Sequence, residues 1–284
     1  VALLVAVASL EQASAADAIR VGGTGTAIGA LQQVATKFAA DIGGKVVVVP
    51  ALGSSGSLRA LIDGKLELAV IARPLTSDET AAGLRPSLVL RTPYVMATPH
   101  RGAGDLKAAD IAKIYAANSP VWPDGTPIRI ILRPRSDTDT ELLGALFPGM
   151  RDAMEAARRR KEVPIAATDQ DNADEAEHLT GSLIGATTTQ IKTEGRQLHV
   201  LSIDGIEPTL ANFENGTYPY AKKLYVIVKG DANPGVAGFV SHSSLSWIVI
   251  CLCQDPQLVA PTAASRGGQR RLTTDGSGRE GMED

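Results

Sequence analysis

Three short segments rich in small hydroxyl residues and glycine carry the chemistry that this sequence offers. They lie at residues 22–26 (GGTGT), 53–57 (GSSGS) and 136–140 (SDTDT). Each segment follows an apolar, strand-like run and precedes a helical pattern. Such loops present backbone N–H groups and hydroxyls at a helix N-terminus, which favours the binding of an oxyanion. Three of them, far apart in the sequence, predict loops that converge on one ligand.

Composition excludes several other classes of function. The 284 residues carry a net charge of −3, which provides no basic field for nucleic acid or acidic membrane. Aromatic residues make up 4% of the chain, too few for a base-stacking surface. Cys251 and Cys253 are one residue apart, a spacing that would strain a disulfide, and the histidines are dispersed. We therefore expect no nucleic-acid partner, no metal site and no cofactor.

The Gly-rich loops depart from the usual catalytic motifs. Residues 53–56 (GSSG) do not match the Gly-x-Ser-x-Gly elbow of hydrolases, and no loop ends in the Gly-Lys-Ser/Thr of a P-loop. Asp137 and Asp139 lack the further ligands that a metal phosphoesterase needs. We therefore expect a binding protein and not an enzyme.

Hydrophobic periodicity predicts an α/β fold. Apolar, strand-like runs at 19–21, 45–50 and 68–72 alternate with helical patterns at 30–40 and from 58 onward. This βαβαβ rhythm favours a mostly parallel sheet covered by helices, whose ligands bind beyond the carboxyl ends of the strands. The hydroxyl-rich loops are expected at those ends.

Both ends of the chain differ from the rest in character. Residues 1–10 are apolar and 13–15 (ASA) are small, a pattern typical of a secretory signal; a buried N-terminal strand or helix is the other interpretation. We expect a signal peptide with a truncated start over 1–16, and a periplasmic or secreted mature protein that does not span the membrane. Residues 255–284 are rich in Gly, Arg, Ser and Thr without periodicity, which predicts a disordered or aberrant tail.

Together these segments resemble the phosphate-type (PstS-like) substrate-binding proteins of ABC transporters, which have the type II periplasmic binding fold. The resemblance covers about residues 19–240, and the serine-rich second loop combined with the ARPL strand end is its most specific part. The motifs are GTGT (23–26), LGSSGS (52–57), LELAVIARPL (66–75), RPRSDTDT (133–140) and NGTYPYAKKLY (215–225).

The resemblance implies two α/β lobes with mixed sheets, a hinge, and an anion in the cleft between them. Lobe one would hold residues 17–98 with about 201–250, and lobe two residues 99–200. The ligand would be an inorganic oxyanion, phosphate first, which a monomer captures by hinge closure and delivers to an ABC transporter permease. The alternatives are another oxyanion (tungstate, molybdate, sulfate) or a periplasmic sensor or adhesion module of the same fold.

The candidate ligand-binding residues follow from the loops and the resemblance together. Two arginines at strand ends would add charge-assisted, bidentate contacts with a tetrahedral anion. Arg135 competes with Arg133, because the register of the third loop relative to the family is open by one residue. The candidates are Thr24, Gly25, Thr26, Ser54, Ser55, Gly56, Arg73, Arg133, Asp137, Thr138, Asp139 and Thr140.

Three departures from the family pattern bear on the ligand and on stability. Arg73 stands where the relatives most selective for phosphate carry an Asp that accepts a proton from the ligand. Asp137 or Asp139 could supply that acceptor, or could instead cap the helix at Glu141. After residues 238–240, Ser-His-Ser-Ser and an unrelated tail replace the terminal helix and strand of the family.

Overall fold

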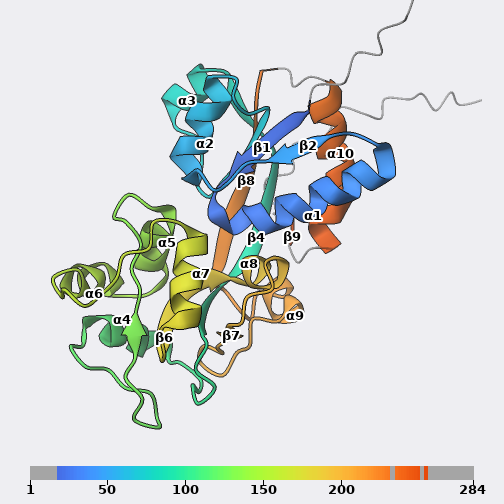
Figure 1. Cartoon of the computed structure of the whole chain (residues 1–284). Helices are drawn as coiled ribbons and strands as arrows, with labels where there is room; N and C mark the ends of the chain where they lie inside the picture. Colours follow the sequence, from blue (N-terminus) through green and yellow to red (C-terminus); the bar gives the residue numbers. More distant parts are fainter. Residues whose placement is uncertain (1–17, 231–233, 250–252, 255–284) are drawn as a thin grey trace, which may run out of the picture.

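The chain folds into two α/β halves joined through one long strand, β4 (Leu84–Thr98) (Figure 1). The computed structural model describes residues 18–230, 234–249 and 253–254. Up to Pro93, β4 pairs with strand β8 (Ala221–Lys229), and beyond it with strand β6 (Ser182–Thr187). The strand therefore belongs to the sheets of both halves and carries the chain from one to the other.

The first half is a mixed sheet with helices on both faces. Its strands, in spatial order, are β2 (Val46–Val48), β1 (Ile19–Gly23), β3 (Leu68–Ile71), β8 (Ala221–Lys229) and the start of β4, which also pairs with β9 (Cys253–Gln254). Strand β1 runs parallel to β2 and β3, whereas β8 is antiparallel to β3 and β4. The helices of this half are α1 (Gly25–Ile42), α2 (Gly53–Ile62), α3 (Ser77–Ala81) and α10 (Pro234–Val249).

The second half is built on the end of β4. It adds the strands β5 (Arg129–Ile130), β6 (Ser182–Thr187) and β7 (His199–Val200). Its helices are α4 (Ala108–Ala116), α5 (Thr138–Leu146), α6 (Met150–Ala157), α7 (Asp169–His178), α8 (Thr188–Thr193) and α9 (Leu210–Glu214). Mixed sheets are thus confirmed. The mostly parallel sheet expected from the βαβαβ rhythm is wrong beyond β2, β1 and β3, because β8 enters from the distant end of the chain.

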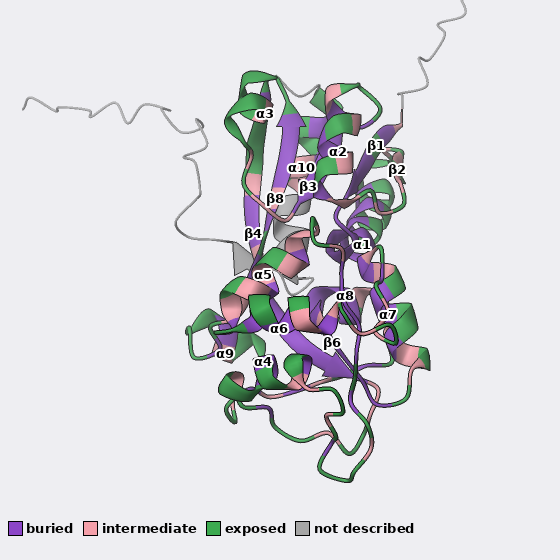
Figure 2. Ribbon diagram, turned by 90° about the vertical axis from the view of Figure 1, so that its left-hand side faces the viewer, coloured by how far each residue is buried: buried purple, intermediate pink, exposed green. Residues whose placement is uncertain are grey.

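The first half has two hydrophobic cores, one on each face of its sheet, because successive side chains of a strand point to opposite faces. Leu68 and Val70 pack with the buried face of α1, whereas Ala69 and Ile71 pack with α2 on the opposite face of the sheet. Figure 2 shows the central strands of both halves, such as β4, β6 and β8, largely buried and the outer faces of the helices exposed. Each half therefore has a core of its own.

The packing suggests where the lobes divide. Tyr94–Ala97 are buried in the core of the second half, together with later residues such as Leu201, Phe213 and Tyr218. We therefore propose boundaries near residues 93 and 221, where the sequence alone placed them near 98 and 201. At this crossing Tyr218 Oη donates to the carbonyl oxygen of Tyr94 at 2.9 Å.

Helix α10 closes the described part of the first half. Val236 and Phe239 lie one turn apart and are both buried, and the ring of Phe239 meets Phe38 of α1 edge-on at 5.2 Å. The expectation that the helix is lost after residues 238–240 is therefore wrong, because the helix runs on to Val249.

The two expected end segments, 1–16 and 255–284, lie outside the described residues. Within the described ranges, no helix combines the length and the apolar character that crossing a membrane requires.

A close approach of backbones positions the first hydroxyl-rich loop. Strand β1 ends at Gly23, and the next residue, Thr24, donates its N–H to the carbonyl oxygen of Val70 on β3 at 2.8 Å. A side chain at Gly23 would collide with that same carbonyl oxygen. The glycine therefore allows β1 to deliver the loop and the N-terminus of α1 at the edge of the sheet.

Gly23→Ala tests this close approach. We expect the overpacking to lower the free energy of unfolding by about 1–3 kcal/mol, measured by urea denaturation, because a backbone atom cannot rotate away. Gly104→Ala is the control, since a methyl group at Gly104 meets nothing within 4 Å. Equal stability of the two variants would contradict the prediction.

Candidate functional site

The first loop forms the N-terminus of α1 and binds a carboxylate. The backbone N–H of Thr26 donates to Asp169 Oδ2 at 3.1 Å, and the Thr26 hydroxyl donates to Oδ1 at 3.2 Å. The Thr24 hydroxyl lies 3.5 Å from Oδ2. A Cβ at Gly25 would lie 2.5 Å from the same oxygen, so only glycine permits this approach. The loop thus binds an oxygen anion, and that anion belongs to the protein.

Asp169 reaches the loop from the other lobe. It is the first residue of α7, whose N-cap Thr168 forms a capping box with Asp171. Helix α7 packs beside α1, and the Asp169 side chain is 7% exposed. The contact between Thr26 and Asp169 therefore joins the two lobes through buried, charge-assisted hydrogen bonds.

Lys222, at the start of β8, is the first of two cations at this carboxylate. Its ammonium group forms an ion pair with Asp139, donates to the Thr26 hydroxyl at 2.7 Å and lies 3.6 Å from Asp169. The side chain is only 2% exposed. The Thr26 hydroxyl thus accepts a hydrogen bond from Lys222 and donates one to Asp169.

Arg133, which follows the buried run after β5, is the second cation. Its Nη2 donates to Asp137 Oδ2 at 2.9 Å and lies 3.9 Å from Asp169, while Nη1 donates to the carbonyl oxygen of Ala166 at 3.2 Å. Asp137 is also the N-cap of α5, accepting from the N–H of Asp139 at 2.9 Å. Asp137 thus holds both a helix terminus and the buried guanidinium in place.

The two cations are already paired with three acidic side chains. Burial raises the pKa of Asp169, but the charges of Lys222 and Arg133 outweigh it and hold the pKa at about 2. Burial, together with the charges of Asp169 and Asp137, raises the pKa of Asp139 to about 7 despite its pairing with Lys222. Asp139 is therefore the last of the buried carboxyls to lose its proton as the pH rises.

The remaining third-loop residues have structural contacts within the second lobe. Thr140 donates its hydroxyl to the carbonyl oxygen of Pro134 at 2.9 Å, and Thr138 is half-buried in the first turn of α5. Arg135 is exposed and forms a bidentate pair with Glu155 at 2.7 and 2.9 Å. The geometry therefore places Arg133, and not Arg135, in the buried cluster.

The second loop and Arg73 form a separate group within the first lobe. Ser54 accepts from the N–H of Ala72 at 3.0 Å, and Ser55 accepts from Arg73 at 3.3 Å. Gly56 follows them in the half-buried first turn of α2. Arg73 forms a bidentate pair with Glu79 at 2.7 and 2.8 Å, which, as the largest influence, raises the pKa of the guanidinium. The positive charge of Arg73 is therefore largely neutralised within its own lobe.

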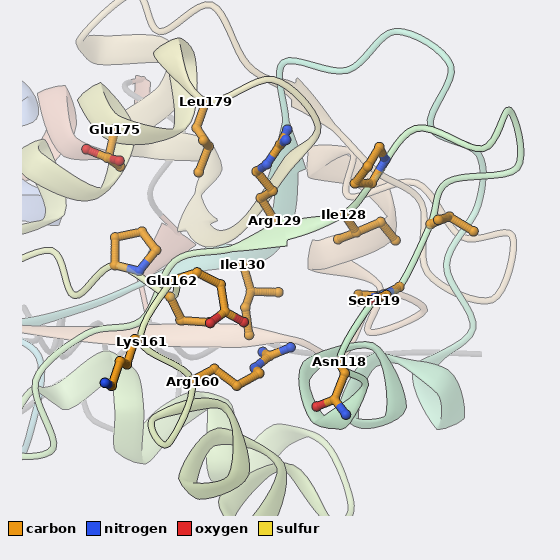
Figure 3. A pocket seen from close by; sticks show the side chains of 15 residues that line it. Asn118, Ser119, Ile128, Arg129, Ile130, Arg160, Lys161, Glu162, Glu175 and Leu179 are labelled. Carbon is orange, nitrogen blue, oxygen red and sulfur yellow. The ribbon is translucent and has the colours of Figure 1, made fainter.

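Free space at the cluster is small. A cavity of about 20 Å³ beside Arg133 and Asp139 has room for about one water molecule. A larger cavity of about 540 Å³ lies elsewhere, beside β5, where Ile128, Arg129 and Arg160 are among its lining residues (Figure 3). None of the residues expected to bind the ligand lines that larger cavity.

Comparison with known proteins identifies the family. A family model described as a PBP superfamily domain matches residues 9–243. The chain belongs to the PBP superfamily. The members of this family are binding proteins and not enzymes. A search of curated proteins finds no match.

Solved structures share the fold at low sequence identity. One is a Clostridium perfringens protein with bound phosphate, assigned as a phosphate ABC transporter substrate-binding protein (14% identity, TM-score 0.70, covering 84% of this chain and 100% of that one). Another is an ABC-type phosphate transport receptor from Vibrio cholerae (15% identity, TM-score 0.58, covering 84% of this chain and 100% of that one). The reduced form of OxyR from N. meningitidis is also similar (9% identity, TM-score 0.58, covering 84% of this chain and 99% of that one). At these identities the PBP superfamily fold is what the structures have in common with this chain.

Sequence reasoning missed two residues of this buried cluster, Asp169 and Lys222. Asp169 follows Thr168 in a Thr-Asp-Gln-Asp run, whose capping-box pattern marks the start of a helix. The pattern does not indicate which distant residues Asp169 contacts in the folded chain. Lys222 occupies an inward position of β8, on the same side of the strand as Leu224 and Val226. A lysine on an otherwise apolar strand face was the available signal.

Lys222→Met tests the buried charge balance. We expect the free energy of unfolding at pH 7.5 to fall by about 3–5 kcal/mol, because Asp139 and Asp169 lose their shared cation. Lys223→Met is the control: it removes the same charge from an exposed position of β8 and should cost at most about 1 kcal/mol. Similar losses in chemical denaturation would contradict a special role for Lys222.

Asp139→Asn tests the raised pKa. Between about pH 4 and pH 7 the folded chain keeps a proton on Asp139 that the unfolded chain has released, so raising the pH lowers the free energy of unfolding. We expect the native protein to lose at least about 1 kcal/mol more than the variant between pH 4.5 and 7.5. The exposed substitution Asp152→Asn should behave as the native protein does. Parallel pH profiles for all three proteins would refute the shift.

Proposed function

We propose that this protein is an extracytoplasmic substrate-binding protein that captures an inorganic oxyanion, phosphate first, for an ABC transporter. One observation carries the proposal: the Thr24 and Thr26 donors at the N-terminus of α1 hold the carboxylate of Asp169. Carboxylate and phosphate oxygens accept the same charge-assisted hydrogen bonds. A helix N-terminus favours both, through its free N–H groups and its dipole.

The donors come from opposite sides of the boundary between the lobes. Thr24 and Thr26 belong to the first lobe, Arg133 to the second, and Lys222 to the strand that crosses back. The lobes are linked at β4 and at the start of β8, an arrangement that suits hinge closure around a ligand. A monomer that closes on its anion and then meets a permease is consistent with this arrangement.

The carboxylates around Arg133 favour phosphate over sulfate. Asp137 and Asp139 can accept hydrogen bonds from an anion that still carries a proton. Hydrogen phosphate carries one at neutral pH, whereas sulfate does not, and two structural neighbours named above are phosphate proteins. The OxyR neighbour shares the fold, and its name mentions no phosphate. The fold alone therefore does not identify the ligand, which a binding experiment tests directly.

Arg133→Gln provides that test by isothermal titration calorimetry with phosphate. We expect about a tenfold or greater loss of affinity, because a charge-assisted hydrogen bond contributes about 1.5–3 kcal/mol. Arg135→Gln is the matched control and should bind within about twofold of the native protein, since Arg135 is exposed and paired with Glu155.

Parallel titrations with sulfate, tungstate and molybdate rank the anions. A folded native protein that binds none of the four would refute the oxyanion proposal. Equal phosphate affinity in the two arginine variants would instead remove Arg133 from the ligand site.

A further inference from the structure

The Asp169 carboxylate occupies the place that an oxyanion ligand would need. It accepts hydrogen bonds from the N–H and hydroxyl of Thr26 at 3.1 and 3.2 Å, with the Thr24 hydroxyl at 3.5 Å. Its distances to Lys222 and Arg133 are 3.6 and 3.9 Å. The proposed function assigns the donors of Thr24, Thr26, Lys222 and Arg133 to the ligand. Each of them therefore already lies within 3.9 Å of the Asp169 carboxylate, which α7 supplies.

The charge around Asp169 disfavours a second anion. The cavity on the second-lobe side of Arg133 and Asp139, which Asp169 does not line, holds about 20 Å³ and is too small to take a tetrahedral oxyanion instead. The two cations already face three carboxylates. An added phosphate would increase the negative charge of a buried region, where unbalanced charge is costly.

The same contacts hold the lobes together. Thr26 belongs to α1 of the first lobe and Asp169 to α7 of the second. Beside them Gln170 Nε2 donates to the carbonyl oxygen of Gly25 at 2.9 Å, and Gln33 Nε2 donates to the carbonyl oxygen of Thr193 at 3.3 Å. The first turn of α7 is thus bound to the loop that the ligand would contact.

We infer that Asp169 is a built-in carboxylate that occupies the oxyanion position and clamps the ligand-free lobes together. This inference rests on the proposed function. An arriving anion must displace Asp169 from the N-terminus of α1, and the lobes must part for it to enter. Asp169 therefore weakens the affinity for the anion, because part of the binding free energy replaces bonds that the protein already makes.

Asp169→Asn tests the displacement, because it removes the charge at nearly constant size. We expect calorimetry with inorganic phosphate to show at least about a tenfold gain in affinity over the native protein. Asp171→Asn is the matched control: Asp171 is exposed in the same turn of α7, its substitution changes the net charge equally, and the variant should bind within about twofold of native. Unchanged or weaker binding by Asp169→Asn would overturn the displacement of Asp169 by the ligand.

Small-angle X-ray scattering without added anion tests the clamp independently. We expect a larger radius of gyration for Asp169→Asn than for the native protein and Asp171→Asn, and a return to the native value with phosphate. Asp169→Ala, which also removes the hydrogen-bond acceptor, should give the same direction and replaces Asp169→Asn if that variant fails to fold. Equal radii in all ligand-free proteins would overturn the clamp.

The two readouts separate failure of the inference from failure of the proposed function. If no protein binds phosphate, sulfate, tungstate or molybdate, the oxyanion function is refuted and with it the displacement step. An expanded Asp169→Asn in that case still supports the clamp. Binding by the native protein, without any gain in Asp169→Asn, refutes the inference alone.

Discussion

A buried carboxylate at the N-terminus of one helix organises the boundary between the two lobes. Asp169 of α7 takes up the free N–H and hydroxyl groups of Thr26 on α1, and the cations Lys222 and Arg133 balance its charge. In a low-dielectric interior none of these groups tolerates the loss of its partner. The positions of α1, α7 and β8 therefore depend on one another, although they come from distant parts of the chain.

The arrangement links fold stability to ligand chemistry. Under the proposed function, the donors that join the two lobes are the same donors that an oxyanion would use, so these contacts and the bound anion would compete. Gly25 has no side chain, so an acceptor can come close to the N-terminus of α1. The Asp169 carboxylate does so here, and an oxyanion in its place would need the same space. In the proposed function the links at β4 and β8 would act as the hinge, and these residues would meet the ligand on closure.

Much of the site was predictable as local structure. The first loop lies at the N-terminus of α1, Ser54 and Ser55 begin α2, and Asp137 caps α5, because turn residues and helix starts depend on neighbours in sequence. Arg73 shows the limit of such reasoning. Its position at a strand end suggested a ligand contact, yet the nearby Glu79 forms a bidentate pair with it.

The sequence by itself determined the α/β class and the loops that present hydroxyls and N–H groups, because periodicity and turn chemistry act over a few residues. Its motifs, and not its periodicity, carried the resemblance to the family. Only the tertiary structure decided that Asp169 and Lys222 meet Thr26, since these contacts span 143 and 196 positions of the chain. Long-range pairing of buried charges leaves no spacing pattern in the sequence. The pairing depends on how the lobes pack, and in this packing the first loop binds the Asp169 carboxylate.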